Sequence, residues 1–262
     1  MPSKREVASA VGIGALVALV VARMREVSSS SAPELEPVTL PPKKTTTEAQ
    51  VDFAFDDAAL LQAGQAGSGR AYVPAGISTP APLLVYLHGN NPSGVMHPWL
   101  GAAGGDLRKL GLGRVIAAPT QTKNASTSTT LWTRFALDAF VDAVEAATGV
   151  PIDRTRVVLA GHSGGACNLA GGIYRPLGKI LPERVMHIDG CFDPRYGAAL
   201  GKLGERVPVE AYFQRVTWPR DFDGFAKAYG ARGVLEEIKG PFLTNPHEDI
   251  VRIALSKKTS LT

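Results

Sequence analysis

The chain has 262 residues, of which 45% are hydrophobic and 20% are charged, and its formal net charge is +4. This composition is ordinary for a globular protein and allows one domain of about 200 residues after a tail of about 50. The lysines and arginines are scattered without interleaved aromatic residues, so nothing in the sequence indicates nucleic-acid binding. Cys167 and Cys191 lack metal-ligand spacing, and we expect no metal and no other cofactor.

Residues 1–26 form a segment of their own. Two basic residues precede an uncharged run at 7–22, and two arginines follow that run. As a helix the run would span about 24 Å, less than a hydrocarbon core of about 30 Å. Both a signal peptide and a short membrane anchor fit this pattern. Because arginine directly follows Ala22, the cleavage signal is poor. We therefore expect an uncleaved anchor with the domain on the extracytoplasmic side; cleavage would instead give a secreted protein.

Residues 27–50 have the composition of a linker. They contain four consecutive serines, four prolines and a run of three threonines. Such a segment cannot build a hydrophobic core, so we expect a tether between the anchor and a globular domain at 51–262.

From residue 51 onward, short apolar runs alternate with segments whose apolar residues recur at helical spacing. The expected strands lie at 51–55, 70–73, 82–87, 114–118, 156–160, 184–188, 207–213 and 234–238. The expected helices lie at 97–110, 131–148, 166–174, 196–203, 222–229 and 246–255. Strands that alternate with helices indicate an α/β fold with a mostly parallel sheet covered by helices on both faces.

The segment 156–166 contains the clearest motif. An apolar run rich in valine reads as a buried strand and leads into Gly161-His162-Ser163-Gly164-Gly165, followed by small apolar residues. Strand, tight turn and helix around G-x-S-x-G are typical of a nucleophile elbow, where glycines make room for a strained serine. A phosphate-binding turn is the alternative, but the chain has neither Gly-x-Gly-x-x-Gly nor a Walker lysine after these glycines.

On this motif the chain resembles the serine α/β-hydrolases over residues 51–255. The resemblance implies an α/β-hydrolase fold, Ser163 as the nucleophile, and a chain order of serine, acid and histidine. Of the two histidines after Ser163, His187 lies inside an expected strand, whereas His247 lies after the last strand, where the family has its histidine. We predict His247 as the base and His187 as a residue packed within the sheet.

Four aspartates are candidates for the acid that orients His247. Asp189 directly follows an expected strand, and Asp193 lies just beyond it. Asp221 and Asp223 follow the next strand, where the family more often has its acid, but they also suit the N-cap of a helix. We favour Asp189, because a carboxylate on a rigid strand end orients a histidine better than one on a loop.

The resemblance also implies an oxyanion hole made by two backbone donors. One is the N–H of Gly164, directly after the nucleophile. The other lies in His88-Gly89-Asn90-Asn91, which is similar to the family's His-Gly loop, and we choose the N–H of Asn90. His88 precedes the serine, so we expect it to brace this loop rather than act as a base. Near the elbow, Cys167 and Cys191 could pair as a disulfide or remain buried thiols.

The substrate is the least constrained feature. The family's lid usually follows the strand after the elbow, but here residues 190–206 leave room for one short helix, so we expect little or no lid. Trp99, Trp132 and Trp218 either line the site or pack in the core. We predict a serine hydrolase that cleaves an ester or amide bond of a small-molecule or polymeric acyl substrate. The alternatives are a membrane-anchored, non-catalytic protein of this fold and a nucleotide-binding protein.

Overall fold

The computed structural model describes residues 43–44, 47–55, 68–90, 106–120, 131–217 and 219–257, all within one compact unit, Pro42–Thr262. The predicted anchor at 7–22, Trp99 and Trp218 lie outside these residues. Among the helices that are described, none is long and apolar enough to cross a membrane.

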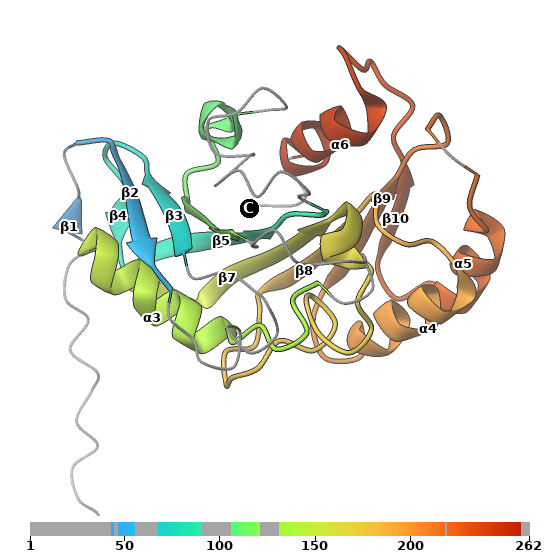
Figure 1. The fold of residues 1–262 in the computed structure, drawn as a ribbon, viewed down its shortest axis with the longest axis horizontal. Helices are drawn as coiled ribbons and strands as arrows, with labels where there is room; N and C mark the ends of the chain where they lie inside the picture. Colours follow the sequence, from blue (N-terminus) through green and yellow to red (C-terminus); the bar gives the residue numbers. More distant parts are fainter. Residues whose placement is uncertain are drawn as a thin grey trace, which may run out of the picture. The chain divides into compact units, whose positions relative to one another are not determined.

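An eight-stranded sheet forms the centre of the domain (Figure 1). Its strands lie in the order β10 (Val234–Glu237), β9 (Val209–Phe213), β8 (Arg184–Ile188), β7 (Ile152–His162), β5 (Ala81–Leu87), β6 (Val115–Thr120), β3 (Ser68–Val73) and β2 (Ala49–Ala54). Strand β3 is antiparallel to both of its neighbours, and the other pairs are parallel. A separate antiparallel pair joins β1 (Lys43–Lys44) and β4 (Ser78–Thr79). Regular structure thus begins slightly before the predicted start at residue 51.

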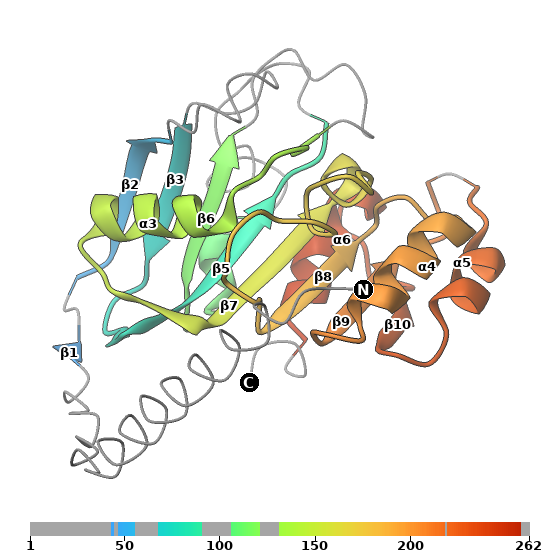
Figure 2. The ribbon, with the colours of Figure 1, turned by 90° about the horizontal axis from the view of Figure 1, so that it is seen from below.

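Helices cover both faces of the sheet, as predicted (Figures 1 and 2). On one face, α3 (Leu137–Thr148), α4 (Pro194–Leu203) and α5 (Phe222–Tyr229) contribute to the larger hydrophobic core. On the other face, α6 (Pro246–Leu255) and the short 3-10 helix η1 (Leu107–Leu110) contribute to the smaller core. Every residue of β5 is buried, and its side chains alternate between the two cores, as the pleat of a strand requires.

The helix predicted at 166–174 does not form. Ser163–Ala166 is a single 3-10 turn, η3, and irregular turns follow it. The Asn168 Oδ1 atom accepts from the backbone N–H of Ala170 at 2.9 Å, and Gly172 has a φ of +53°, so both residues divert the backbone from a helical path. Ser163 therefore does not lie at the start of an α-helix.

Two other predicted helices are shorter than expected. The helix predicted at 131–148 begins only at Leu137, because residues 131–134 form a turn in which Trp132 has a φ of +58°. Of the helix predicted at 97–110, the described part contains only η1, and residues 97–105 lie outside the described ranges.

Candidate active site

The serine turn lies at the carboxyl end of the central strand β7. His162 is the last extended residue, and Ser163 has a φ of +54°, a left-handed conformation that is strained for a residue with a side chain. The turn packs directly on β5: a Cβ atom at Gly165 would lie 2.3 Å from the backbone oxygen of Leu87. Only glycine fits there, so the second glycine of the motif lets the elbow rest on the neighbouring strand.

The strand pairing places Asp189 beside Ser163. In the parallel pair β7–β8, His162 is the partner of Ile188. Ser163 directly follows His162, and Asp189 directly follows Ile188. Asp189 also has a left-handed backbone, with a φ of +43°, and its side chain is fully buried. The predicted approach of Asp189 to His247 is present: His247 Nδ1 lies 2.6 Å from Asp189 Oδ2.

The three other candidate carboxylates have different surroundings. Asp221 caps α5, because its side chain accepts from Gly224 N at 2.8 Å, and Asp193 caps α4 in the same way by accepting from Arg195 N, also at 2.8 Å. The Asp223 side chain is 99% exposed in the first turn of α5. The strand-end position of Asp189 therefore favoured it over the loop positions, as we expected.

Two further side chains bind the Asp189 carboxylate. Gln214 Nε2 donates to Oδ2 at 2.8 Å, and Arg220 Nη1 donates to Oδ1 at 2.5 Å. Burial by itself raises the pKa of Asp189, but the His247 hydrogen bond, the Arg220 charge and the Gln214 amide together hold it below its usual value. The carboxylate is thus ionised and can only accept hydrogen bonds. His247 Nδ1 must carry a proton, which leaves Nε2 with the lone pair that a general base needs.

His162, the first variable residue of the G-x-S-x-G motif, contacts His247. Its Nε2–H donates to the backbone oxygen of His247 at 2.8 Å, and the two rings lie 4.5 Å apart between centroids. Burial, and then the charge of His247, lower the pKa of His162 to about 3. His162 is therefore neutral at physiological pH and holds the base without taking up a proton itself.

The loop that carries His247 is held by its own helix. Asn245 Oδ1 accepts from His247 N at 3.0 Å and caps α6, whose first residue is Pro246. Asp249 is buried, and its Oδ2 atom accepts from the backbone N–H groups of Leu243 and Thr244 at 2.6 and 2.8 Å. These bonds fix the path of the chain into α6 and therefore the position of His247.

The loop after β5 touches the serine turn, as the predicted oxyanion hole requires. A Cβ atom at Gly89 would lie 2.5 Å from Ser163 Cβ, 2.8 Å from its Oγ and 3.0 Å from Gly164 N. Asn90, our second predicted donor, follows directly and is exposed. His88 braces the loop: its Nδ1–H donates to Gly89 O at 2.7 Å.

Trp132 holds the same loop from the other side. Its buried indole Nε1–H donates to His88 O at 3.0 Å. Asn168 in turn fixes the turn around Trp132, because its Nδ2 atom donates to Leu131 O at 2.7 Å and Thr133 Oγ1 at 3.0 Å. We had expected Trp132 either to line the site or to pack in the core, and it is a core residue with one hydrogen bond to the loop beside Ser163.

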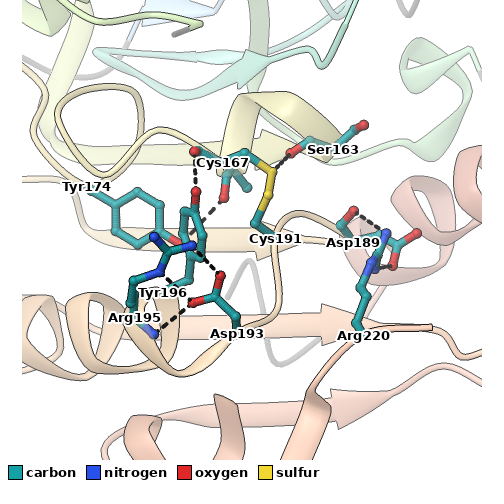
Figure 3. The surroundings of a disulfide bond; sticks show 10 residues. Ser163, Cys167, Tyr174, Asp189, Cys191, Asp193, Arg195, Tyr196 and Arg220 are labelled. Carbon is teal, nitrogen blue, oxygen red and sulfur yellow. Dashed lines mark hydrogen bonds and ion pairs between the residues drawn. A yellow bond between two sulfur atoms is a disulfide. The ribbon is translucent and has the colours of Figure 1, made fainter. Parts of the chain in front are cut away.

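A pocket of about 440 Å³ opens beside Ser163. Its lining residues are Ser163, Gly164, Cys167, Asp189, Gly190, Cys191, Phe192, Asp193, Pro219 and Arg220. Cys167 and Cys191 form a disulfide with a Cα–Cα distance of 5.0 Å, so the alternative of two thiols is wrong (Figure 3). The disulfide joins the segment after the serine to the loop after Asp189. Residues 190–206 contain only α4, as expected for a site without a large lid at that point.

The sequence did not indicate Gln214 and Arg220 as partners of the acid. Both lie in the loop after β9, ahead of the two candidate carboxylates Asp221 and Asp223. His187 behaves as predicted: it is fully buried in β8 and contacts the ring of Phe192 at 4.6 Å between centroids. Within the described ranges, no group of three or more histidine, cysteine, aspartate or glutamate side chains could hold a metal ion.

No protein-family model and no curated protein matches this chain. Similar solved structures include a hyperthermophilic esterase from Pyrobaculum calidifontis, with 14% identity, a TM-score of 0.47 and coverage of 83% of this chain and 87% of that one. Carboxyl esterase 2 of Tuber melanosporum has 14% identity and a TM-score of 0.46 over 92% and 94% of the two chains. At these scores the likeness carries no argument. The α/β-hydrolase fold is assigned from this chain's own strand order and its serine turn.

Proposed function

We propose that this protein is a serine hydrolase that cleaves an ester or amide bond through an acyl-enzyme on Ser163. The observation that carries the proposal is the 2.6 Å contact between His247 Nδ1 and the buried Asp189, on the strand edge where Ser163 has its strained φ of +54°. A turn with only a structural role would not need the strained serine, the buried carboxylate and the contact between that carboxylate and a histidine together. A serine, an oriented histidine and a buried carboxylate are the parts that acyl transfer requires.

The proposed reaction has two stages. In the first, Ser163 Oγ attacks the carbonyl carbon of the substrate while His247 Nε2 takes the serine proton. The N–H groups of Gly164 and Asn90 stabilise the resulting oxyanion. The tetrahedral intermediate then collapses as His247 returns the proton to the leaving group, which gives the acyl-enzyme. In the second stage, water attacks the acyl carbon, His247 takes its proton, and Ser163 leaves with that proton.

The pocket beside Ser163 supports a substrate group of modest size. Its volume of about 440 Å³ is in the range of small-molecule sites. Its lining includes Phe192, the two cysteines of the disulfide and Arg220, so the pocket combines apolar and charged groups. We propose an acyl substrate that reaches the site without the opening of a large lid.

A fluorophosphonate probe tests this function directly. We expect the protein to be labelled at Ser163 and to hydrolyse a p-nitrophenyl ester. Ser163→Ala should abolish both while the protein stays folded. Ser256→Ala is the matched control, because its hydroxyl only bonds Arg252 O at the end of α6. Hydrolysis by Ser163→Ala at the wild-type rate would refute the proposal.

The alternative is a non-catalytic binding protein that keeps the fold. It would bind ligands at the pocket but show no labelling by the probe. The alternative was open mainly because the sequence left the acid undecided, and the contact between Asp189 and His247 weighs against it.

We further propose that the N-terminal segment holds the protein at a membrane, with the domain on the extracytoplasmic side. The full chain should then fractionate with membranes, and a chain that starts at Ala49 should not. A shortened soluble chain recovered from cells that express the full sequence would indicate a cleaved signal peptide instead.

A further inference from the structure

We propose that Arg220 is a positioning residue of the site: its guanidinium fixes the ionised Asp189 carboxylate against His247, and its charge sets how far the reaction persists toward low pH. This inference rests on the proposed function, since it assigns Asp189 and His247 the roles of acid and base. Arg220 binds the acid directly, so its effect should appear in the pH dependence of the reaction.

The contacts of Arg220 hold its guanidinium in one place. Nη1 donates to Asp189 Oδ1 at 2.5 Å, and Nη2 donates to the backbone oxygen of Asp189 at 3.4 Å (Figure 3). The side chain is only 8% exposed and lies against the rings of Phe192 and Phe222, at 5.7 and 6.0 Å from their centroids. An exposed arginine would exchange conformers, but these contacts on three sides give a charge with a fixed position.

The two carboxylate oxygens of Asp189 have different partners. Oδ2 faces His247 and Gln214, whereas Oδ1 faces Arg220. A buried carboxylate with no other charge nearby strongly favours the protonated, cationic form of an adjacent histidine. Here the carboxylate and the guanidinium form a neutral pair, so a proton on His247 adds a net positive charge next to Arg220. The charge of Arg220 therefore opposes the charge of the carboxylate at the base.

Within the described ranges, the neighbours of His247 on β7, on the loop after β9 and in the first turn of α6 carry no positive charge. From β7, His162 faces His247 as a neutral ring, and the loop after β9 contributes the neutral Gln214. From α6, the carboxyl groups nearest in sequence are Glu248 and Asp249. Burial raises the pKa of Glu248, and Asp249 accepts bonds from its own loop.

The remaining groups near the acid lie after and within β8. Asp193, on the loop that follows the strand, is paired with Arg195 at 3.0 Å. His187, within the strand, is buried, and after burial itself the Arg220 charge is the next cause that lowers its pKa, to about 4.

The experiment is the pH dependence of kcat/KM for a neutral ester in four proteins: wild type, Arg220→Gln, Arg220→Lys and Arg215→Gln. Arg220→Gln keeps a hydrogen-bond donor and removes the charge, and Arg220→Lys keeps the charge. Arg215 is the matched control, because it lies in the same loop and stacks on Phe222 but pairs with Glu237. If Arg220→Gln does not fold, Arg220→Met keeps the packing on Phe192 and serves as the neutral variant.

We expect the acid limb of the profile to move to higher pH by about one unit in Arg220→Gln. The limb should stay close to wild type in Arg220→Lys and in Arg215→Gln. A loss of kcat/KM by the same factor at every pH would overturn the inference, because a merely structural role predicts that result. A rise in KM alone would also overturn it and would make Arg220 a substrate contact.

Labelling by the fluorophosphonate probe distinguishes a failure of the proposed function from a failure of the proposed role of Arg220. If wild type is not labelled at Ser163, the proposed function fails, and the role of Arg220 fails with it. If wild type is labelled and its acid limb coincides with that of the neutral variant, only the role of Arg220 fails.

Discussion

Gly89→Ala is the sharpest test of the loop beside Ser163. The added methyl group would lie 2.5 Å from Ser163 Cβ, which is far inside van der Waals contact, and 3.0 Å from Gly164 N, which is a tight contact. Gly89 is not among the glycines with positive φ, so its backbone accepts alanine without strain. The clash cannot be relieved by a side-chain rotation, since Ser163 Cβ and Gly164 N belong to the elbow itself. Either the loop or the elbow must move, and the oxyanion donors then separate.

The expected magnitude follows from the loss of one oxyanion donor. Such a loss lowers kcat by about 10²–10³-fold, or roughly 3–4 kcal/mol of transition-state stabilisation. We expect a decrease of this size in kcat for a p-nitrophenyl ester, and a parallel decrease in the rate of fluorophosphonate labelling. The melting temperature should also fall by a few degrees, because Gly89 is buried and overpacking there costs about 1–3 kcal/mol.

Gly111→Ala is the matched control. Gly111 has a φ of +59° and nothing within 4 Å of an added Cβ, so alanine there costs about 1 kcal/mol of backbone strain without reaching the site. It should lower the melting temperature by about 2–4 °C and leave kcat/KM within about twofold of wild type. If Gly89→Ala keeps wild-type kcat, the loop after β5 does not form the oxyanion hole.

Three further predictions concern the acid, the disulfide and the buried histidines. Asp189→Asn should lower turnover by about 10³–10⁴-fold and also destabilise the fold, because Arg220 loses its countercharge; a loss under about tenfold would contradict the proposed triad. Replacing Cys167 and Cys191 by serine should lower the free energy of unfolding by about 3 kcal/mol, measured by urea unfolding, since the bond closes a loop with a sequence separation of 24; equal stability with and without reductant would refute this. Burial lowers the pKa of His162 to about 3 and of His187 to about 4, so the unfolded chain binds more protons below about pH 6.5. The free energy of unfolding should therefore fall as the pH drops from about 6.5, by on the order of 4 kcal/mol at pH 5, and an unchanged urea midpoint over that range would contradict it.

Local pattern was sufficient for the features that depend on neighbours in sequence. The apolar run before Gly161 predicted a buried strand, and the glycines around Ser163 predicted the tight turn. Asn245 and Pro246 have the residue types of a helix start, which is why α6 begins where expected. The position of Asp189 at the end of a strand also predicted that it lies beside Ser163, since neighbouring parallel strands end on the same edge of the sheet, and His247 contacts it there.

Local pattern failed where long-range contacts outweigh local preference. The small residues after Ser163 suggested a helix, but the turn of Asn168 and the left-handed Gly172 replace it. Trp132 fitted the apolar stripe of a helix, yet its backbone is left-handed and its indole binds the loop after β5. In both cases the deciding partner lies more than thirty residues away in the chain.

The surroundings of the acid depended on tertiary structure alone. Gln214 and Arg220 lie in a loop with no motif, and they meet Asp189 only because β8 and β9 pair in the sheet. The pairing of Cys167 with Cys191 also stayed open until the turn after Ser163 and the loop after Asp189 came together. Sequence periodicity specifies which face of an element is buried, but it carries no signal for which loops meet at the edge of a sheet. That meeting is fixed by strand order and register, and the charge around the proposed base depends on it.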